Sequence, residues 1–148
     1  MADYFTVSES RDTELFARLN QQRGWFTEWQ RTPKFGEYDV TAVDTKGRQC
    51  VIELKYRDLP SDAYDSYIIE SDKLTDGLLY HLRGIKPLYF NFFNDGKVLI
   101  WDLSDPDNKP VKQKGRRDNP GHGRQDSSCY YLLPAQTARV STLLPCED

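Results

Sequence analysis

Two short segments in the first half of the chain alternate polar and apolar side chains with the period of two that is typical of β-strands. In residues 37–43 this alternation places Asp39 on one face and hydrophobic side chains on the other. In residues 50–56 it places Glu53 and Lys55 together on one face, again opposite hydrophobic side chains. The sequence therefore predicts two half-buried strands, each with an acid on its polar face.

The segment between these strands, residues 44–48, predicts a tight turn. It contains Asp44 and Gly47, which are residues that such reversals favour. The two strands should then form a hairpin, in which Asp39 and Glu53 approach each other across the strands. Opposed carboxylates are unfavourable unless a cation lies between them. Oxygen ligands of this kind suit Mg²⁺, and Mn²⁺ can substitute for it.

Helical spacing and further apolar runs predict the elements around the hairpin. They are a helix over 10–19 that starts at Ser8 or Ser10 and stops at Gly24, a strand over 25–29, a helix over 71–83 that starts at Ser71, strands over 88–93, 98–103 and 128–133, and a short helix over 135–140. In the second long helix, Leu74, Leu78 and Leu82 are spaced to form an apolar stripe.

The predicted order is therefore helix, three strands, helix, strand, followed by further strands. This order, together with the motif Glu53-Leu54-Lys55, resembles the PD-(D/E)xK nuclease superfamily, which includes type II restriction endonucleases, archaeal Holliday junction resolvases and recombination exonucleases. The resemblance covers approximately residues 14–93. Tyr38 stands where the name-giving proline would be, at a position that varies widely in the superfamily.

The resemblance implies a fold class and a metal site. The implied fold is α/β, with a restriction endonuclease-like αβββαβ core, a mixed central sheet flanked by helices, and extra C-terminal strands. By the family pattern, Asp39 and Glu53 would be the metal-binding acids, and the backbone carbonyl of Leu54 would be a further ligand. Lys55 would be the catalytic lysine.

Two further site residues follow from the same resemblance. Glu14 matches the acid on the first helix that many members use as a direct or outer metal ligand. Lys73 lies on the second helix, where several members place a Gln or Lys near the scissile phosphate.

Ordinary explanations stand beside these assignments. Glu-x-Lys is a common pattern on the solvated face of an antiparallel hairpin, and Lys73 can equally be a surface lysine. Glu37, at the start of the first strand, is either an acid at the rim of the site or a solvated edge residue.

Composition limits the architecture and the compartment. The chain has 148 residues, 38% of them hydrophobic, which predicts a single domain over residues 1–148. No apolar stretch is long enough to span a bilayer and the N-terminus lacks a signal pattern, so we expect a cytoplasmic protein with no membrane partner. The three cysteines are far apart and form no Cys-x-x-Cys pair, which indicates neither a disulfide scaffold nor a zinc site.

The net charge of −3 argues against a broadly basic nucleic-acid binder, but basic residues cluster late in the chain. Glycine and proline among them predict a flexible basic loop at about 105–127. Its candidate nucleic-acid contacts are Lys112, Lys114, Arg116, Arg117 and Arg124. These cations could follow a phosphate backbone, and a purely solubilising loop is the alternative.

These patterns together predict a Mg²⁺-dependent nuclease that hydrolyses phosphodiester bonds of DNA, with structured or branched DNA as the substrate that the resolvase-like order suggests. Homodimers are expected by family precedent. RNA stays open as a substrate because the motif contains no test of the 2′-hydroxyl. The rival hypothesis is a catalytically inactive protein of the same fold that binds nucleic acid or a protein partner.

Overall fold

The computed structural model describes residues 4–33, 38–114 and 129–146. In chain order its elements are α1 (Tyr4–Arg23), β1 (Phe26–Arg31), β2 (Val40–Asp44), β3 (Gln49–Arg57), β4 (Ser66–Glu70), α2 (Ser71–Leu82), β5 (Lys86–Phe93), β6 (Lys97–Asp102), the 3-10 helix η1 (Pro106–Asn108), β7 (Val111–Lys114), β8 (Cys129–Pro134), the 3-10 helix η2 (Ala135–Thr137) and β9 (Arg139–Thr142).

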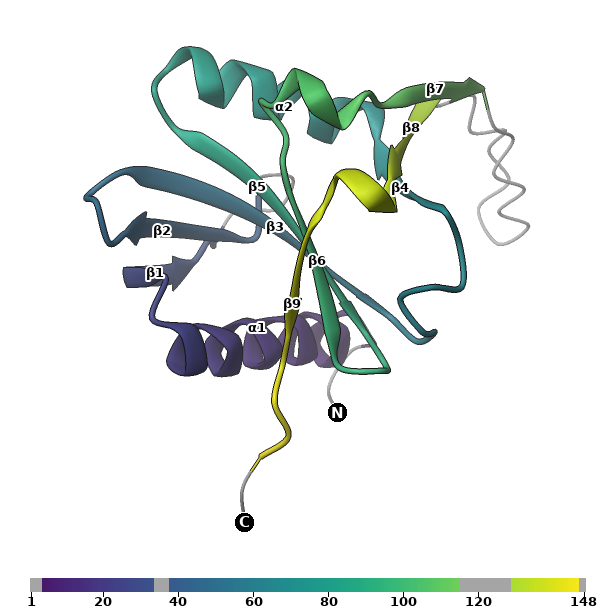
Figure 1. Ribbon diagram of the computed structural model, residues 1–148. Helices are drawn as coiled ribbons and strands as arrows, with labels where there is room; N and C mark the ends of the chain where they lie inside the picture. Colours follow the sequence, from purple (N-terminus) through teal and green to yellow (C-terminus); the bar gives the residue numbers. More distant parts are fainter. Residues whose placement is uncertain (1–3, 34–37, 115–128, 147–148) are drawn as a thin grey trace.

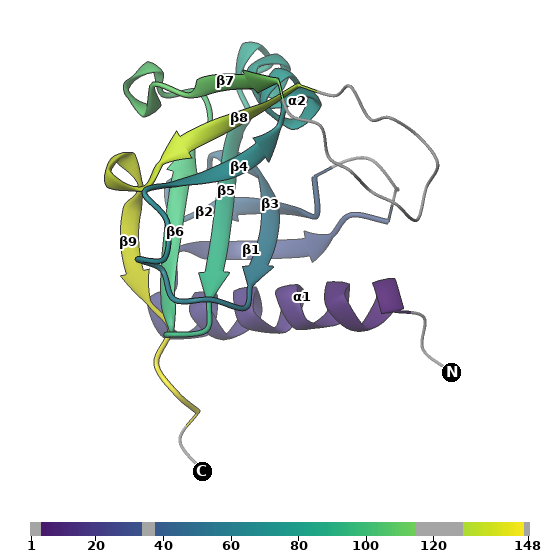
Figure 2. The ribbon, with the colours of Figure 1, turned by 90° about the vertical axis from the view of Figure 1, so that its right-hand side faces the viewer.

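The strands form two sheets. The central sheet has six strands in the order β1-β2-β3-β5-β6-β9, and the smaller sheet has three in the order β4-β8-β7. In the central sheet β3 and β5 are parallel and every other neighbouring pair is antiparallel, so the sheet is mixed, as predicted. A parallel pair needs a crossover, which β4 and α2 supply (Figures 1 and 2).

The central sheet separates two hydrophobic cores. On one face, Phe16 and Leu19 of α1 pack against Ile52 and Phe90, and we call this the α1-side core. On the other face, the α2-side core joins the sheet to α2 and to the small sheet, with α2 and α1 lying on opposite sides in Figure 1. The members of the α2-side core include Val51, Tyr67, Ile69, Tyr89, Trp101 and Leu133. Central strands are therefore covered on both faces.

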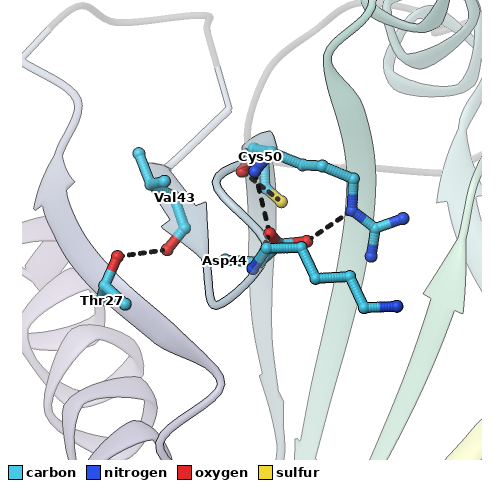
Figure 3. Close-up of polar contacts among 6 residues, drawn as sticks. Thr27, Val43, Asp44 and Cys50 are labelled. Carbon is cyan, nitrogen blue, oxygen red and sulfur yellow. Dashed lines mark hydrogen bonds and ion pairs between the residues drawn. The ribbon is translucent and has the colours of Figure 1, made fainter.

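The predicted hairpin is confirmed. Strands β2 and β3 pair antiparallel, with Val40 opposite Ile52. Asp44 organises the turn, because its carboxylate accepts hydrogen bonds from the backbone N–H groups of Lys46 and Arg48, both at 2.9 Å (Figure 3). These backbone donors and the Arg48 side chain lower the pKa of Asp44. Gly47 has a φ of +80°, a conformation that glycine adopts without strain.

The structure corrects several predicted boundaries at the start of the chain. Helix α1 begins at Tyr4, so Ser8 and Ser10 lie within it and are not its caps; no glycine or proline interrupts this stretch. Strand β2 begins only at Val40, so Asp39 precedes it, and Glu37 falls outside the described residues.

Helix α2 has nearly the predicted range but differs in its cap and in its buried face. Its N-cap is Glu70, and Ser71 is the first helical residue. The expected apolar stripe is not buried: Leu78 is 48% exposed and Leu82 is 80% exposed. The helix turns Gly77 towards the sheet, where a Cβ atom would lie 2.7 Å from Tyr38 Oη. The close approach of the helix to this hydroxyl group explains why glycine occupies a helix interior.

The C-terminal third contains more structure than the predicted flexible loop over about 105–127. Its described part holds η1 and strand β7, which pairs with β8. Hydrogen bonding to β8 therefore fixes the backbone of residues 111–114, which sequence composition alone had assigned to a loop. The short helix predicted over 135–140 is present only in its first half, as the 3-10 helix η2, which ends at Thr137 and is followed by β9.

Candidate active site

One cavity of about 320 Å³ collects the predicted catalytic residues. Its lining includes Asp39, Glu53, Leu54, Lys55 and Lys73 together with Asp12, Arg31, Arg57, Ile68, Ile69, Glu70 and Tyr89. Strand β3 contributes Glu53, Lys55 and Arg57 from one face, while Ile52 and Leu54 pack in the α1-side core on the other. The period-two reading of this strand is thus confirmed.

Asp39 reaches the site from the bend before β2. Its Oδ2 accepts a hydrogen bond from the backbone N–H of Leu54 at 2.8 Å. Its Oδ1 lies 3.8 Å from Arg31 Nη2 at the end of β1. The bond to Leu54 attaches the carboxylate directly to β3, one residue beyond Glu53. Asp39 and Glu53 are therefore brought together, as the hairpin predicted.

Glu53 is held between an acid and a cation. Its Oε2 lies 3.4 Å from Lys73 Nζ, and the two side chains are only 16% and 15% exposed. Lys73 Nζ also lies 5.5 Å from the centre of the Tyr38 ring, and Tyr38 Oη donates to the Lys73 carbonyl at 2.6 Å. Lys73 therefore reaches the site from α2 and is not a solvated surface lysine.

Burial and nearby carboxyl groups raise the pKa values of Glu53 and Asp12. Desolvation, followed by the nearby Asp39 carboxyl group, raises the pKa of Glu53 to about 8, against the smaller opposing effect of Lys73. Desolvation and Asp39 likewise raise the pKa of Asp12 to about 6. One oxygen of each group, Glu53 Oε1 and Asp12 Oδ1, is buried and accepts no hydrogen bond from the described residues.

The acid that α1 contributes is Asp12, and Glu14 does not line the cavity. Asp12 lies four residues before Phe16, which packs in the α1-side core, so both side chains are on the inward face of the helix. Glu14 is exposed on another face. Helical spacing from Phe16 is the signal that distinguishes the two acids, and applying it to the sequence would have identified Asp12.

The remaining predicted residues lie at different places. Lys55 is exposed and lines the cavity, where its charge partly offsets the rise that desolvation and Asp39 cause in the pKa of Asp12. Because the Leu54 side chain packs in the α1-side core, it is the main chain of this residue that borders the cavity. Lys112 is exposed on β7 and Lys114 is the last residue of that strand. The other candidate nucleic-acid contacts, Arg116, Arg117 and Arg124, lie outside the described residues.

Sequence reasoning missed Arg31 and Arg57. Arg31 donates to Thr13 Oγ1 and lies beside Asp39, so it connects α1, β1 and the site. Its position at the end of a strand gave no signal of this contact. Arg57 lies two residues beyond Lys55, and the same alternation that selected Glu53 and Lys55 also selects Arg57.

The donor set fits a hard divalent cation. Within the described ranges, no three His, Cys, Asp or Glu side chains converge into a closed cage. Mg²⁺ sites commonly use only one or two carboxylates, with water and phosphate oxygens completing the shell. The unpartnered oxygen of Glu53, the adjacent Asp39 carboxylate and the main chain of Leu54 meet this requirement. A cation would also relieve the repulsion that raises the pKa of Glu53.

The architecture is that of the restriction endonuclease-like fold, the fold of PD-(D/E)xK nucleases. A structure of similar architecture is Hjc, a Holliday junction resolvase of the archaeal hyperthermophile Archaeoglobus fulgidus. The two share 11% sequence identity over 86% of each chain, with a TM-score of 0.53. No protein-family model and no curated protein sequence matches the chain. At this identity the likeness confirms the predicted fold class.

The described part of the chain includes no helix that is long and apolar enough to cross a bilayer.

Proposed function

We propose that the protein is a Mg²⁺-dependent nuclease that hydrolyses phosphodiester bonds of DNA, with Mn²⁺ able to replace Mg²⁺. The observation that carries this proposal is the meeting of Asp39 and Glu53, with Lys55 and Lys73, in one cavity of a restriction endonuclease-like fold. Two acids this close together, one of them with a raised pKa, do not stabilise a hydrophobic core. They can, however, serve phosphodiester chemistry.

Each residue has a task in this chemistry. A divalent ion at the site would supply charge neutralisation of the phosphoryl group and a lowered pKa for a bound water. Asp39, Glu53 and the Leu54 carbonyl would hold the ion. The Lys55 ammonium would orient the attacking water or stabilise the charge that develops on the phosphoryl group. Lys73, in contact with Glu53 Oε2, fixes the orientation of that carboxylate.

The acids also argue against a protein that only binds nucleic acid. Asp12, Asp39 and Glu53 present carboxyl groups at the cavity where a phosphate would have to lie. Without a cation, these groups repel a phosphate backbone whenever they are ionised. A binding site for DNA alone would gain affinity by losing them, so their presence favours metal-dependent catalysis.

Branched DNA is the substrate that we favour. The similar structure from Archaeoglobus fulgidus is a Holliday junction resolvase, and its likeness extends over 86% of the present chain. The exposed Lys112 on β7 offers a cation for backbone contact, and Lys114 belongs to the same strand.

A branched substrate is best cut by two copies acting together, and the exposed face of α2 fits a second copy of this chain. That face consists of Asp72, Thr75, Leu78, Leu79, Leu82 and Arg83. Its three leucines are 48%, 54% and 80% exposed. In an antiparallel pairing of two α2 helices, Asp72 of one copy lies near Arg83 of the other and the leucines meet between them. This charge complementarity is the reason for choosing a second copy as the occupant.

Cleavage assays test the function. Wild-type protein should cut a four-way junction in Mg²⁺ or Mn²⁺ more readily than linear duplex, single-stranded or nicked DNA or RNA, and EDTA should abolish cutting. Asp39→Asn keeps an oxygen for the Leu54 N–H while removing the charge, and Lys55→Met removes the ammonium. Each should reduce the rate by about 10²-fold or more while circular dichroism shows that the fold is retained.

The matched control is Glu28→Gln, an exposed acid on β1 outside the cavity, which should cut like wild type. Cutting that persists in EDTA would reject the metal. Wild-type rates in both Asp39→Asn and Lys55→Met would reject this site as the catalytic one.

A further inference from the structure

Arg57 extends the row of site residues on β3. It follows Glu53 and Lys55 at intervals of two residues, so its side chain lies on the same face of the strand. It lines the same cavity, and successive residues of this row are about 6–7 Å apart along the strand. The guanidinium therefore lies one step beyond Lys55 within the cavity and, along the strand, two steps beyond Glu53.

The contacts that hold Arg57 are all with neutral groups. Its Nε donates to Asn91 Oδ1 at 2.6 Å, and its Nη2 donates to the Ile68 carbonyl at 3.0 Å and to Tyr89 Oη at 3.3 Å. Its guanidinium carbon lies 5.2 Å from the centre of the Tyr67 ring. Asn91 is fully buried. The guanidinium is thus fixed on one side by the strand and by groups that carry no charge.

Arg57 forms no direct ion pair with an acid in the described part of the chain. Its third nitrogen, Nη1, has no acceptor among the same residues. A half-buried guanidinium is normally paired with an acid, because removing a charge from water is costly. An anion that binds in the cavity would supply the missing partner.

We infer that Arg57 binds a backbone phosphate next to the scissile one, an inference that rests on the proposed nuclease function. Guanidinium groups form charge-assisted hydrogen bonds to phosphate oxygens in a fixed geometry. The contacts to Asn91 and Ile68 orient this group before the substrate arrives. The cavity then has two parts: the acids and Lys55 act on the scissile phosphate, while Arg57 fixes the register of its neighbour.

Asn91→Asp is the most direct test. It changes one atom of a fully buried side chain and places a carboxylate against Arg57 Nε, so the guanidinium acquires an internal counter-charge. Arg57 keeps its contact and the fold is retained, while its attraction for phosphate falls. Arg57→Met removes the charge outright. Arg139→Met is the control, since it removes an exposed arginine outside the cavity.

The measurement is the binding of a short fluorescent DNA duplex with Ca²⁺ in place of Mg²⁺, so that a cation neutralises the cavity acids, over a range of salt concentrations and with the DNA checked to be uncut. We expect binding to weaken about tenfold in Arg57→Met and also to weaken in Asn91→Asp. The slope of log K against log salt should become shallower by about 0.9, as for one lost phosphate contact. Arg139→Met should bind like wild type.

The outcomes separate this inference from the proposed function. Wild-type affinity and salt slope in a folded Asn91→Asp and a folded Arg57→Met would overturn the role of Arg57, even if the protein is a nuclease. If Arg57→Met does not fold, Asn91→Asp decides. A wild-type protein that binds DNA without ever cutting it would refute the nuclease and leave this test in force. A wild-type protein that binds no DNA would overturn both.

Discussion

Glu53 is the residue at which folding and the proposed chemistry conflict most. It lies next to another carboxyl group, and burial adds to the cost of its charge. Lys73 offsets only part of this cost. Catalytic groups are commonly held in such unfavourable surroundings, because the same surroundings give them affinity for a cation or a proton.

The raised pKa of Glu53 predicts how stability depends on pH. The carboxyl group has an ordinary pKa of 4.5 in the unfolded chain and about 8 in the folded protein. Between these values the folded state binds more protons, so the free energy of unfolding should decrease as pH rises from about 4.5 to about 8. Urea unfolding at several pH values in EDTA measures this decrease.

Glu53→Gln provides the comparison for this experiment. The amide cannot ionise, so the variant should lose much of the pH dependence and should be more stable than wild type at pH 8. Part of the slope should survive at lower pH, because the pKa of Asp12 is raised to about 6. An identical slope in wild type and Glu53→Gln would show that Glu53 is not the group responsible.

At this scale the sequence predicted the pair of acids but not the whole site. Alternation along 50–56 correctly placed Glu53 and Lys55 on one face, because β3 is a regular strand. The choice of Glu14 over Asp12 on α1 came from family resemblance, whereas the position of Phe16 favours Asp12. The contact between Lys73 and Glu53 joins distant segments, and no local pattern encodes it.

Helix α2 shows how one element is fitted to the sheet. Gly77 allows the helix to approach Tyr38, whose hydroxyl group donates to the Lys73 carbonyl in the first turn. Burial raises the pKa of Tyr38, so the hydroxyl stays protonated and remains a donor at every physiological pH. This contact fixes the position of the first turn of α2, and with it Lys73, relative to β3.

Gly77→Ala tests this fit. Alanine is the better helix former by about 1 kcal/mol, yet the new Cβ would meet Tyr38 Oη at 2.7 Å. Because the hydroxyl or the helix must move, we expect a net loss of about 1–3 kcal/mol in the free energy of unfolding. Chemical denaturation provides the measurement.

The double variant Gly77→Ala/Tyr38→Phe makes this test specific. Removing the hydroxyl should recover part of the loss, so the two substitutions should be non-additive. Tyr38→Phe alone should cost about 1 kcal/mol through its hydrogen bond to Lys73. Strict additivity of the two effects would mean that the hydroxyl group does not limit the approach of α2.

Some elements were predicted correctly from the sequence and others were missed. The hairpin of β2 and β3 was predicted because alternation and turn chemistry agree there. Strand β4, which was not predicted, pairs only with β8, a segment far along the chain. Helical spacing predicted an apolar stripe on α2, but it does not say what covers the stripe, and Leu78 and Leu82 are exposed.

For the whole molecule, the exposed leucines of α2 predict self-association. Leu78→Glu combined with Leu82→Glu should shift the protein from dimer to monomer in sedimentation velocity, because the acids would face each other across the proposed two-fold axis. Val140→Glu, at a 58% exposed position on β9, is the matched control and should leave the dimer intact. A monomeric wild-type protein at micromolar concentration would contradict the dimer.

The fold class could be predicted because the order of elements, together with Glu53-Leu54-Lys55, resembles a known superfamily, although the structure adds β4 as a fourth strand between the two helices. The small sheet could not be predicted in the same way. It joins a strand before α2 to two strands from the last third of the chain. Such long-range pairing depends on packing against the α2-side core, in which Ile69 and Leu133 meet.

The parallel pairing of β3 with β5 sets an order in which the site can assemble. Asp39 and Glu53 meet within one local hairpin, whereas Lys73 arrives only with the crossover that joins β3 to β5. Local contacts form before distant ones during folding. Arg31 next to Asp39 comes with the local pairing of β1 and β2, but Lys73 reaches Glu53 later, so we expect ionised Glu53 to slow folding as well as to reduce stability. Protonation or a bound cation would remove this slowing of folding. The rate of folding would then depend on the same groups that are proposed to carry out the reaction.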